Sequence, residues 1–203
     1  MDDDFVRVPK TAAGVIGRCL HEGRWYEEKM LNYIASLELD GIYLDVGANI
    51  GNHAMFFAKH TRASHVFSVE PTHSTLAILY EFLILNDAVS RISVLPFAAG
   101  SDRETFALDA ATVRFSKQTH VPSIRLDDVI PDGVTLLKMD IEGAEPVALK
   151  GMTRILTVDR PRMFIEANDE SAKAAIERII LPLDYRPTGQ VFNASPTYEY
   201  MPA

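Results

Sequence analysis

A glycine-containing segment and an acidic residue downstream of it carry the first chemical signal in this sequence. The segment Asp45-Val-Gly47-Ala-Asn49-Ile-Gly51 has two glycines, which allow a tight turn and a close approach of the backbone to a ligand. Glu70 lies about 20 residues beyond the turn, where an acidic residue accepts hydrogen bonds from a ribose diol. The pattern predicts a nucleoside site, although an ordinary tight turn between a strand and a helix would also explain both glycines. The candidate binding residues are Asp45, Gly47, Asn49, Gly51 and Glu70.

The spacing of the glycines and the charge beside them distinguish between nucleoside ligands. A dinucleotide site has the pattern Gly-x-Gly-x-x-Gly, whereas this segment has only Gly-x-x-x-Gly, so a pyrophosphate would have poor access to the backbone. Asp45 would repel phosphates and favours a cationic ligand. S-adenosylmethionine has a ribose, an α-ammonium group and a sulfonium group but no phosphate, and we expect it to be the cofactor. A dinucleotide-dependent oxidoreductase and a non-catalytic S-adenosylmethionine-binding module are the alternatives.

A second group of charged residues follows a later apolar segment, in the sequence Lys138-Met-Asp140-Ile-Glu142-Gly. A charge inside an apolar strand is costly unless it is paired, so Lys138 either forms a structural ion pair with a nearby glutamate or takes part in catalysis. We predict that Asp140 acts as a general base that orients a substrate group and takes its proton, with Glu142 and Glu166 beside it. Glu145 is better explained as a favourable charge near a helix N-terminus. The candidate catalytic residues are Lys138, Asp140, Glu142 and Glu166, and no metal site is expected.

The elements that must position these residues follow from the pattern of apolar residues. Short apolar segments predict strands at 41–46, 65–69, 91–95, 134–139 and 162–165, and helical spacing predicts helices after Gly51 and at 73–86, 144–156 and 171–180. Strands that alternate with helices favour a parallel sheet covered on both faces. Ligands of such sheets bind outside the carboxyl ends of the strands, so we expect the charged residues at that edge, together with Ala98 in the cofactor site.

The remaining segments are less regular. We expect a short strand at 105–108, a loop at 110–120 and a brief helix at 126–130. Residues 186–203 predict an antiparallel hairpin, because two β-rich segments flank the turn-forming sequence Asn193-Ala-Ser-Pro196. Trp25 and Tyr26 are expected to cover the core, while His53 and His120 are possible bases that more often have structural roles. We interpret residues 1–40 as an N-terminal helical or cap segment and residues 41–203 as the catalytic domain.

Composition and charge limit the class of protein. The chain has 203 residues, of which 47% are hydrophobic and 24% charged, as is typical of a globular domain. The net charge of −8 argues against duplex nucleic acid as the main partner, because phosphate binding needs a basic surface. No apolar segment reaches the roughly 18 residues that span a bilayer, and the acidic N-terminus is unlike a secretory signal. We therefore expect a cytoplasmic protein without a membrane or nucleic-acid partner.

Three segments together resemble the FkbM-type S-adenosylmethionine-dependent methyltransferases. They are Asp45–Asn52 (DVGANIGN), Val69–Pro71 (VEP) and Leu137–Glu145 (LKMDIEGAE), and the resemblance extends from Trp25-Tyr-Glu27 to Glu166. The segment Lys-x-Asp-x-Glu-Gly-x-Glu is its most specific part. The resemblance implies a class I methyltransferase fold, which is an α/β sandwich with a mostly parallel sheet. It also implies O-methylation of sugars, polyketides or other hydroxylated natural products, with a small molecule or a glycan as the acceptor.

Overall fold

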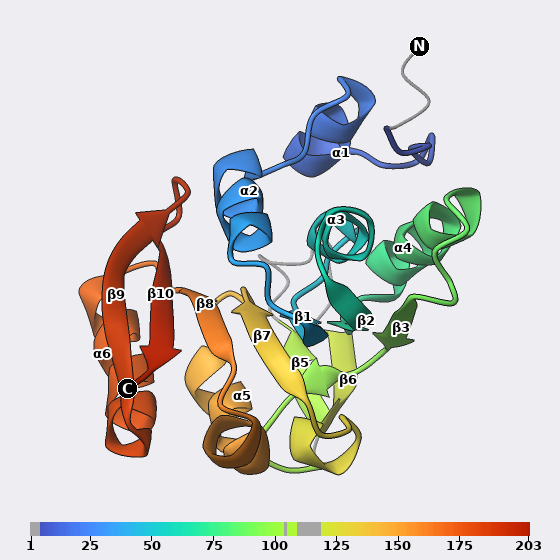
Figure 1. The fold of residues 1–203 in the computed structure, drawn as a ribbon. Coiled ribbons are helices and arrows are strands. Elements are labelled where there is room, and N and C mark those ends of the chain that lie inside the picture. The colour runs from blue at the N-terminus through green and yellow to red at the C-terminus, as the bar shows by residue number, and fades with distance from the viewer. Residues whose placement is uncertain (1–4, 104, 109–118) are drawn as a thin grey trace.

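A seven-stranded sheet forms the centre of the protein (Figure 1). In the computed structural model, which describes residues 5–103, 105–108 and 119–203, the strands run in the order β3-β2-β1-β7-β8-β10-β9. The parallel strands are β1 (Gly41–Val46), β2 (Ala63–Val69), β3 (Ile92–Leu95), β7 (Val134–Met139) and β8 (Arg162–Glu166). Their apolar side chains are buried on both faces, which confirms the five strands predicted from the sequence.

The C-terminal residues form the predicted antiparallel hairpin. It consists of β9 (Tyr185–Phe192) and β10 (Thr197–Pro202), and β10 also pairs in antiparallel register with β8. Because β10 runs opposite to β8, the turn of the hairpin lies at the carboxyl end of β8. There Thr197 pairs with Glu166, and the Ala167 amide donates a 2.9 Å hydrogen bond to the Pro196 carbonyl.

Helices cover both faces of the sheet (Figure 1). One face shares an apolar core with α1 (Gly14–His21), α2 (Glu28–Ser36), α3 (Asn52–His60) and α4 (His73–Leu85). The other face packs against α5 (Glu145–Lys150), a π-helical turn at Ile155–Asp159 and α6 (Glu170–Ile180). Short 3₁₀ helices occupy Leu126–Asp128, where a brief helix was expected, and Leu181–Leu183. Among the described residues, no helix is both long and apolar enough to span a bilayer.

A second, three-stranded sheet was not expected from the sequence. It contains β4 (Ala98–Ala99), β6 (Thr119–Ile124) and β5 (Thr105–Leu108), with β6 in the middle. The strand at 105–108 is confirmed, but the loop predicted at 110–120 is wrong at its last two residues, which belong to β6. Residues 110–118 lie outside the described part of the chain. β6 could not be predicted from the sequence, because Pro122 is unusual inside a strand. In addition, β6 pairs with β4 and β5, and tertiary structure brings these two partners together.

The helix predicted at 144–156 is interrupted, because α5 ends at Lys150 and helical structure resumes at residue 153, leading into the π-helical turn at Ile155–Asp159. A Cβ atom on Gly151 would lie 1.9 Å from the Gly100 carbonyl oxygen, so the chain makes a close backbone contact there. The Asp127 carboxylate then accepts hydrogen bonds from the amides of Arg154 (2.8 Å) and Ile155 (3.1 Å). The close contact at Gly151 thus coincides with the break after α5, and Asp127 fixes the chain where helical structure resumes.

Strand register brings the charged residues of neighbouring strands together. Asp45 in β1 is the register partner of Lys138 in β7, which in turn is the partner of Phe164 in β8. Phe164 belongs to the core beneath α1 to α4, and side chains two residues apart in a strand share a face. The carboxyl edge of the sheet on this face therefore collects Asp45, Lys138, Asp140 and Glu166.

Candidate functional site

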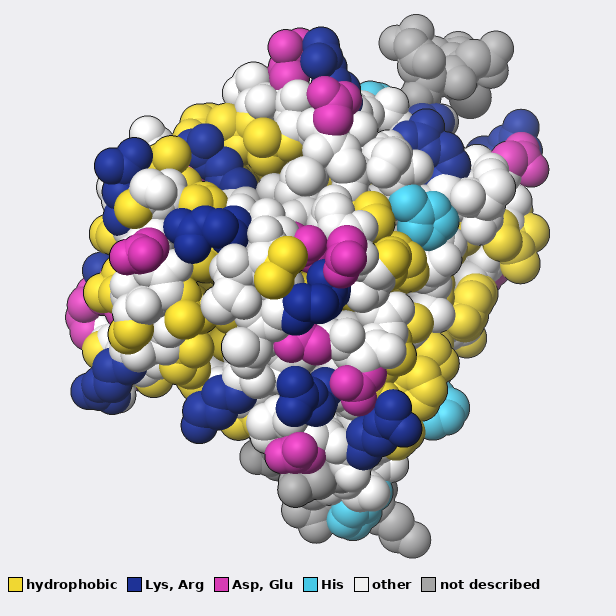
Figure 2. Space-filling model, turned by 60° about the horizontal axis from the view of Figure 1, so that its bottom comes forward, with side chains coloured by type: hydrophobic (Ala, Val, Ile, Leu, Met, Phe, Trp, Pro, Cys, Tyr) yellow, Lys and Arg dark blue, Asp and Glu magenta, His cyan; other side chains and the backbone are white. Residues whose placement is uncertain are grey.

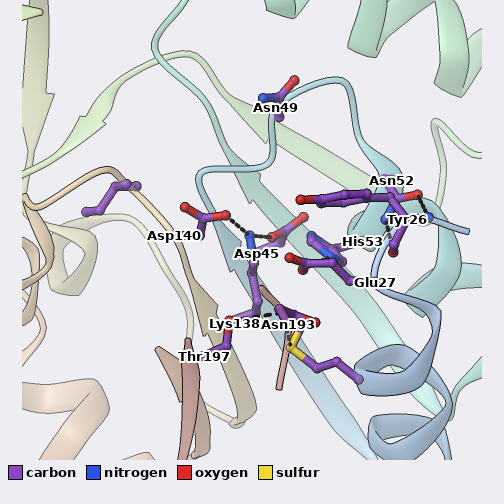
Figure 3. Close-up of polar contacts among 12 residues, drawn as sticks. Tyr26, Glu27, Asp45, Asn49, Asn52, His53, Lys138, Asp140, Asn193 and Thr197 are labelled. Carbon is purple, nitrogen blue, oxygen red and sulfur yellow. Dashed lines mark hydrogen bonds and ion pairs between the residues drawn. The ribbon is translucent and has the colours of Figure 1, made fainter. Parts of the chain in front are cut away.

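A buried lysine between two carboxylates forms the centre of the candidate site (Figure 3). Lys138 Nζ lies 3.8 Å from Asp45 Oδ1 and 3.5 Å from Asp140 Oδ2. The Lys138 side chain is 2% exposed and that of Asp45 is fully buried, whereas that of Asp140 is 29% exposed. Burial disfavours the charged form of Lys138, but the carboxylates of Asp140 and Asp45 outweigh it and hold the lysine pKa above its usual value. Lys138 is therefore a charged member of the site, in the ion pair that burial requires.

Asp45 and Asp140 differ in what they offer to a ligand. Neither Asp45 carboxylate oxygen accepts a hydrogen bond from the described residues, although both atoms are buried. Asp45 therefore acts on its surroundings through its charge. Asp140 follows the last residue of β7 and is partly exposed, so its carboxylate is accessible at the edge of the sheet.

Glu166, which ends the neighbouring strand β8, interacts electrostatically with Asp140. Burial and the interaction with Asp140 raise the pKa of Glu166 to about 8. Burial acts in the same direction on Asp140, but the charge of Lys138 prevails, so the Asp140 pKa is lowered. At neutral pH, Glu166 is thus mainly protonated and Asp140 ionised. Glu142 is exposed and affects this pair only through its charge, which adds to the rise in the Glu166 pKa.

The glycine turn after β1 packs directly against the end of β7. Gly47 has a φ of 85°, and a Cβ atom there would lie 1.8 Å from the Asp140 carbonyl oxygen, so only glycine fits. Gly51, with a φ of 92°, precedes α3 and donates a 2.9 Å hydrogen bond to the Ala48 carbonyl. The start of the turn therefore packs on the Asp140 backbone, and its end leads directly into α3.

Glu70 lies at the carboxyl end of β2, beside this turn. Its Oε2 accepts a 3.0 Å hydrogen bond from the Asn49 amide and its Oε1 a 2.8 Å bond from the Thr72 amide. Burial raises the Glu70 pKa, and these two bonds oppose the rise. A carboxylate has about four lone-pair sites, so Glu70 retains acceptor capacity on both oxygens for a diol. Ala98, also predicted for the cofactor site, begins β4 and is half-buried, a short distance along the chain from the end of β3.

Asn49, predicted for the cofactor site, has its side chain at the outer side of the glycine turn. Its side chain is exposed, points away from the charged cluster in Figure 3, and accepts a 2.8 Å hydrogen bond from the Ile50 amide. The backbone amide of Asn49 has the clearer role, because it orients Glu70.

Sequence reasoning missed a second polar pair of the site, Glu27 and His53. Glu27 Oε2 lies 3.0 Å from His53 Nε2, and the two side chains are only 8% and 6% exposed. Tyr26, which precedes Glu27, is fixed as well. The Asn52 side chain accepts a 3.0 Å hydrogen bond from the Tyr26 amide and donates another of 3.0 Å to the Tyr26 carbonyl. Figure 3 shows this segment beside Asp45 and Lys138. The available signal was that Asn52 and His53 directly follow the glycine turn.

Several other residues have structural roles. Trp25 is buried against Phe5, Phe56 and His60, which confirms that it covers the core. Tyr26 is only partly buried, and the charges of Glu27, Asp140 and Glu166 contribute, after burial, to a raised pKa of its phenol. Glu145 accepts hydrogen bonds from the amides of Ile141 (2.9 Å) and Gly143 (3.3 Å), so it stabilises the loop that leads from β7 into α5. His120 is exposed on β6 in the second sheet.

Comparison with known proteins identifies the family. Residues 45–187 match the family model described as the methyltransferase FkbM domain. This chain belongs to the FkbM methyltransferase family. The match covers the glycine turn, Glu70, the Lys138–Asp140 segment and Glu166 of this FkbM-family protein, and confirms the resemblance inferred from the sequence.

Individual relatives agree with this assignment. Methyltransferase sdnD of Sordaria araneosa is 27% identical to the FkbM-family chain across 59% of this chain and 63% of its own length. The crystal structure of methyltransferase FkbM from Methylobacillus flagellatus KT is 26% identical with a TM-score of 0.62, and the match covers 80% of this chain and 43% of that one. The chain thus spans less than two thirds of the length of both.

A more distant structure supports the fold alone. A putative methyltransferase from Streptococcus mutans, solved in complex with SAH, is 13% identical with a TM-score of 0.55 over 87% of this chain and 96% of that one. The fold of this FkbM-family chain is therefore that of the class I methyltransferases, with a mostly parallel sheet and antiparallel C-terminal strands.

Proposed function

We propose that the chain transfers the methyl group of S-adenosylmethionine to a hydroxyl group of a sugar, a glycan or another small metabolite. The observation that carries this proposal is the excess of negative charge at the carboxyl edge of the sheet. Asp45, Asp140 and Glu27 are three carboxylates that share one lysine and one histidine. Such a site favours a cationic ligand, and S-adenosylmethionine carries two cationic groups and no phosphate.

The residues beside this cluster fit the rest of the cofactor. Glu70 has acceptor sites left for the two hydroxyls of a ribose, and Gly47 and Gly51 leave the backbone of the turn without side chains. The cofactor, when bound, supplies an activated methyl group on its sulfonium. Ala98 and the Asn49 amide are the remaining residues that we assign to the cofactor side of the site.

We assign the acceptor side to Asp140, with Glu166 and Lys138 holding it in place. Asp140 is the accessible carboxylate of the cluster, and it is ionised at neutral pH because Lys138 and Glu166 stabilise its charge. It can orient an acceptor hydroxyl and take its proton. Positioning of the reactants contributes up to about 7–11 kcal/mol to such a transfer, against about 3–5 kcal/mol for a general base. Asp140 can therefore serve as the general base although its pKa is lowered, because positioning contributes more to the rate than the base does.

A small acceptor agrees with the surface charge. The net charge of the chain is −8. On the face shown in Figure 2, basic and acidic side chains are interspersed and form no continuous basic stripe. A polyanion such as a nucleic acid would find little complementary charge on this face.

A calorimetric titration tests the cofactor. We expect S-adenosylhomocysteine to bind and NAD to bind far more weakly, and we expect Glu70→Gln to lose affinity for S-adenosylhomocysteine, because a hydrogen bond to a charged group contributes about 1.5–3 kcal/mol. Glu81→Gln, at an exposed site on α4, is the matched control. Preferential binding of NAD would instead support a dinucleotide-dependent oxidoreductase.

Methyl transfer from labelled S-adenosylmethionine into glycans and metabolite extracts tests the reaction. Asp140→Asn should lower turnover with little change in cofactor affinity if Asp140 acts on the acceptor. A loss of cofactor affinity instead would assign Asp140 to the sulfonium end of the cofactor, and loss of activity on chelation would make it a ligand of a divalent ion. Binding of S-adenosylhomocysteine without any methyl transfer would support the alternative that the protein is a non-catalytic S-adenosylmethionine-binding module.

A further inference from the structure

Glu27 is a buried charge to which the proposed reaction gives no role. Its carboxylate lies 3.0 Å from His53 Nε2, and its charge helps to hold the Lys138 pKa above the usual value, after those of Asp140 and Asp45. Burying a third carboxylate beside two others costs free energy. If Glu27 only fastened the segment before α2 to the body of the protein, the Asn52 hydrogen bonds to Tyr26 would already achieve this.

The position of Glu27 follows the order of the strands. Glu70 ends β2 and Asp140 follows β7, and β1 lies between these two strands. A nucleoside ligand held at Glu70 that extends toward Asp140 must therefore cross the end of β1. His53 belongs to α3, which directly follows the turn after β1. The Glu27–His53 pair therefore lies near the end of β1, where such a ligand would pass. Figure 3 shows the Glu27 carboxylate beside Asp45 and Lys138, on the side of the cluster away from Asn49.

Burial separates the roles of the two residues. The Nε2 atom of His53 is fully buried and makes no hydrogen bond with the described residues, so it is withdrawn from any ligand or acceptor hydroxyl. The polar group closest to it is the carboxylate of Glu27, at 3.0 Å. Since each carboxylate oxygen has two lone pairs, Glu27 keeps acceptor sites that His53 does not use.

We propose that Glu27 binds the α-ammonium group of S-adenosylmethionine and that His53 is the residue that positions the Glu27 carboxylate. This inference rests on the proposed function and adds the residue that recognises the amino-acid end of the cofactor. The adenosine end is then recognised by Glu70 on β2, the reacting end lies near Asp140 on β7, and the amino-acid end lies over β1. The negative charge of the buried cluster is thereby divided between the two cationic groups of one ligand.

Two probes that differ only in the amino-acid part test this assignment by calorimetry. S-adenosylhomocysteine carries the α-amino group, whereas 5′-methylthioadenosine keeps the nucleoside and the thioether and lacks the amino acid. Glu27→Gln should weaken binding of S-adenosylhomocysteine at least about tenfold and leave 5′-methylthioadenosine unchanged. His53→Gln should show a smaller loss with the same selectivity. Glu28→Gln, an identical charge change at the exposed next residue, should bind both probes as the wild type does.

The outcomes separate the alternatives. Unchanged affinity of Glu27→Gln for S-adenosylhomocysteine overturns the inference, and an equal loss for both probes shows that Glu27 only supports the fold. Should Glu27→Gln not fold, the wild-type protein still decides, because an S-adenosylhomocysteine analogue with hydrogen in place of the α-amino group should bind at least about tenfold more weakly. Equal binding of this analogue rejects the ammonium contact. A wild-type protein that binds neither probe overturns the proposed function itself.

Discussion

Replacement of Lys138 by methionine is the most direct perturbation of the site, because it removes the charge and keeps most of the volume. At an effective dielectric constant of about 20, attractions over 3.8 Å and 3.5 Å amount to about 4–5 kcal/mol each before desolvation is subtracted. Burial of the lysine offsets much of this gain. Loss of one member of a buried pair typically costs about 3–5 kcal/mol, since it leaves uncompensated charge. We expect Lys138→Met to lose about this much stability at pH 7.

Urea unfolding followed by far-UV circular dichroism measures the effect. Lys150→Met, at an exposed site in the last turn of α5, is the control and should change the free energy of unfolding by less than about 0.5 kcal/mol. Adding Asp45→Asn to Lys138→Met should restore part of the loss, because it removes one of the two unpaired carboxylates. A loss below about 1 kcal/mol for Lys138→Met alone would refute the view that charge holds these residues together.

Three further predictions concern the proton on Glu166, the hairpin and the glycine turn. The Glu166 pKa rises from 4.5 to about 8 on folding, so the contribution of Glu166 to stability is complete below pH 4.5 and disappears as the pH rises through 8. The urea midpoint of the wild type should therefore fall over this pH range, and Glu166→Gln should make the fall smaller. Glu199, 1% exposed, accepts hydrogen bonds from Arg162 Nε (2.6 Å) and from a tyrosine hydroxyl of α2 (3.1 Å). Glu199→Gln should therefore lower the free energy of unfolding by about 3 kcal/mol, and an unchanged midpoint would mean that the network is not stabilising. Gly47→Ala, where the Cβ meets a carbonyl oxygen at 1.8 Å, should lose far more stability than Gly143→Ala, where φ is 96° and no atom lies within 4 Å; equal losses, each of about 1–2 kcal/mol, would show that only backbone strain matters.

The sequence alone was sufficient for the features that depend on local chemistry. Apolar segments of four to seven residues have few alternatives to a buried strand, so β1, β2, β3, β7 and β8 were predictable. Glycine is the residue that tolerates the backbone of the turn after β1, and the spacing to Glu70 reflects the fixed length of a helix between two parallel strands. The hairpin was predictable for the same reason, because its turn residues lie next to its strands in the chain.

Contacts between distant segments were decided only by the tertiary structure. The sequence left the partner of Lys138 open among nearby glutamates, but its partners are two aspartates. Asp140 is close in the chain, whereas Asp45 lies far away in the chain and becomes a partner only through the order of the strands. No spacing rule links Glu27 to His53, and that pair forms because the N-terminal segment packs across the start of α3. Electrostatic energy depends on distance in space and on burial. Residue types and spacing therefore determined which groups could form a site, and packing determined which of them are close enough to share a charge or a proton.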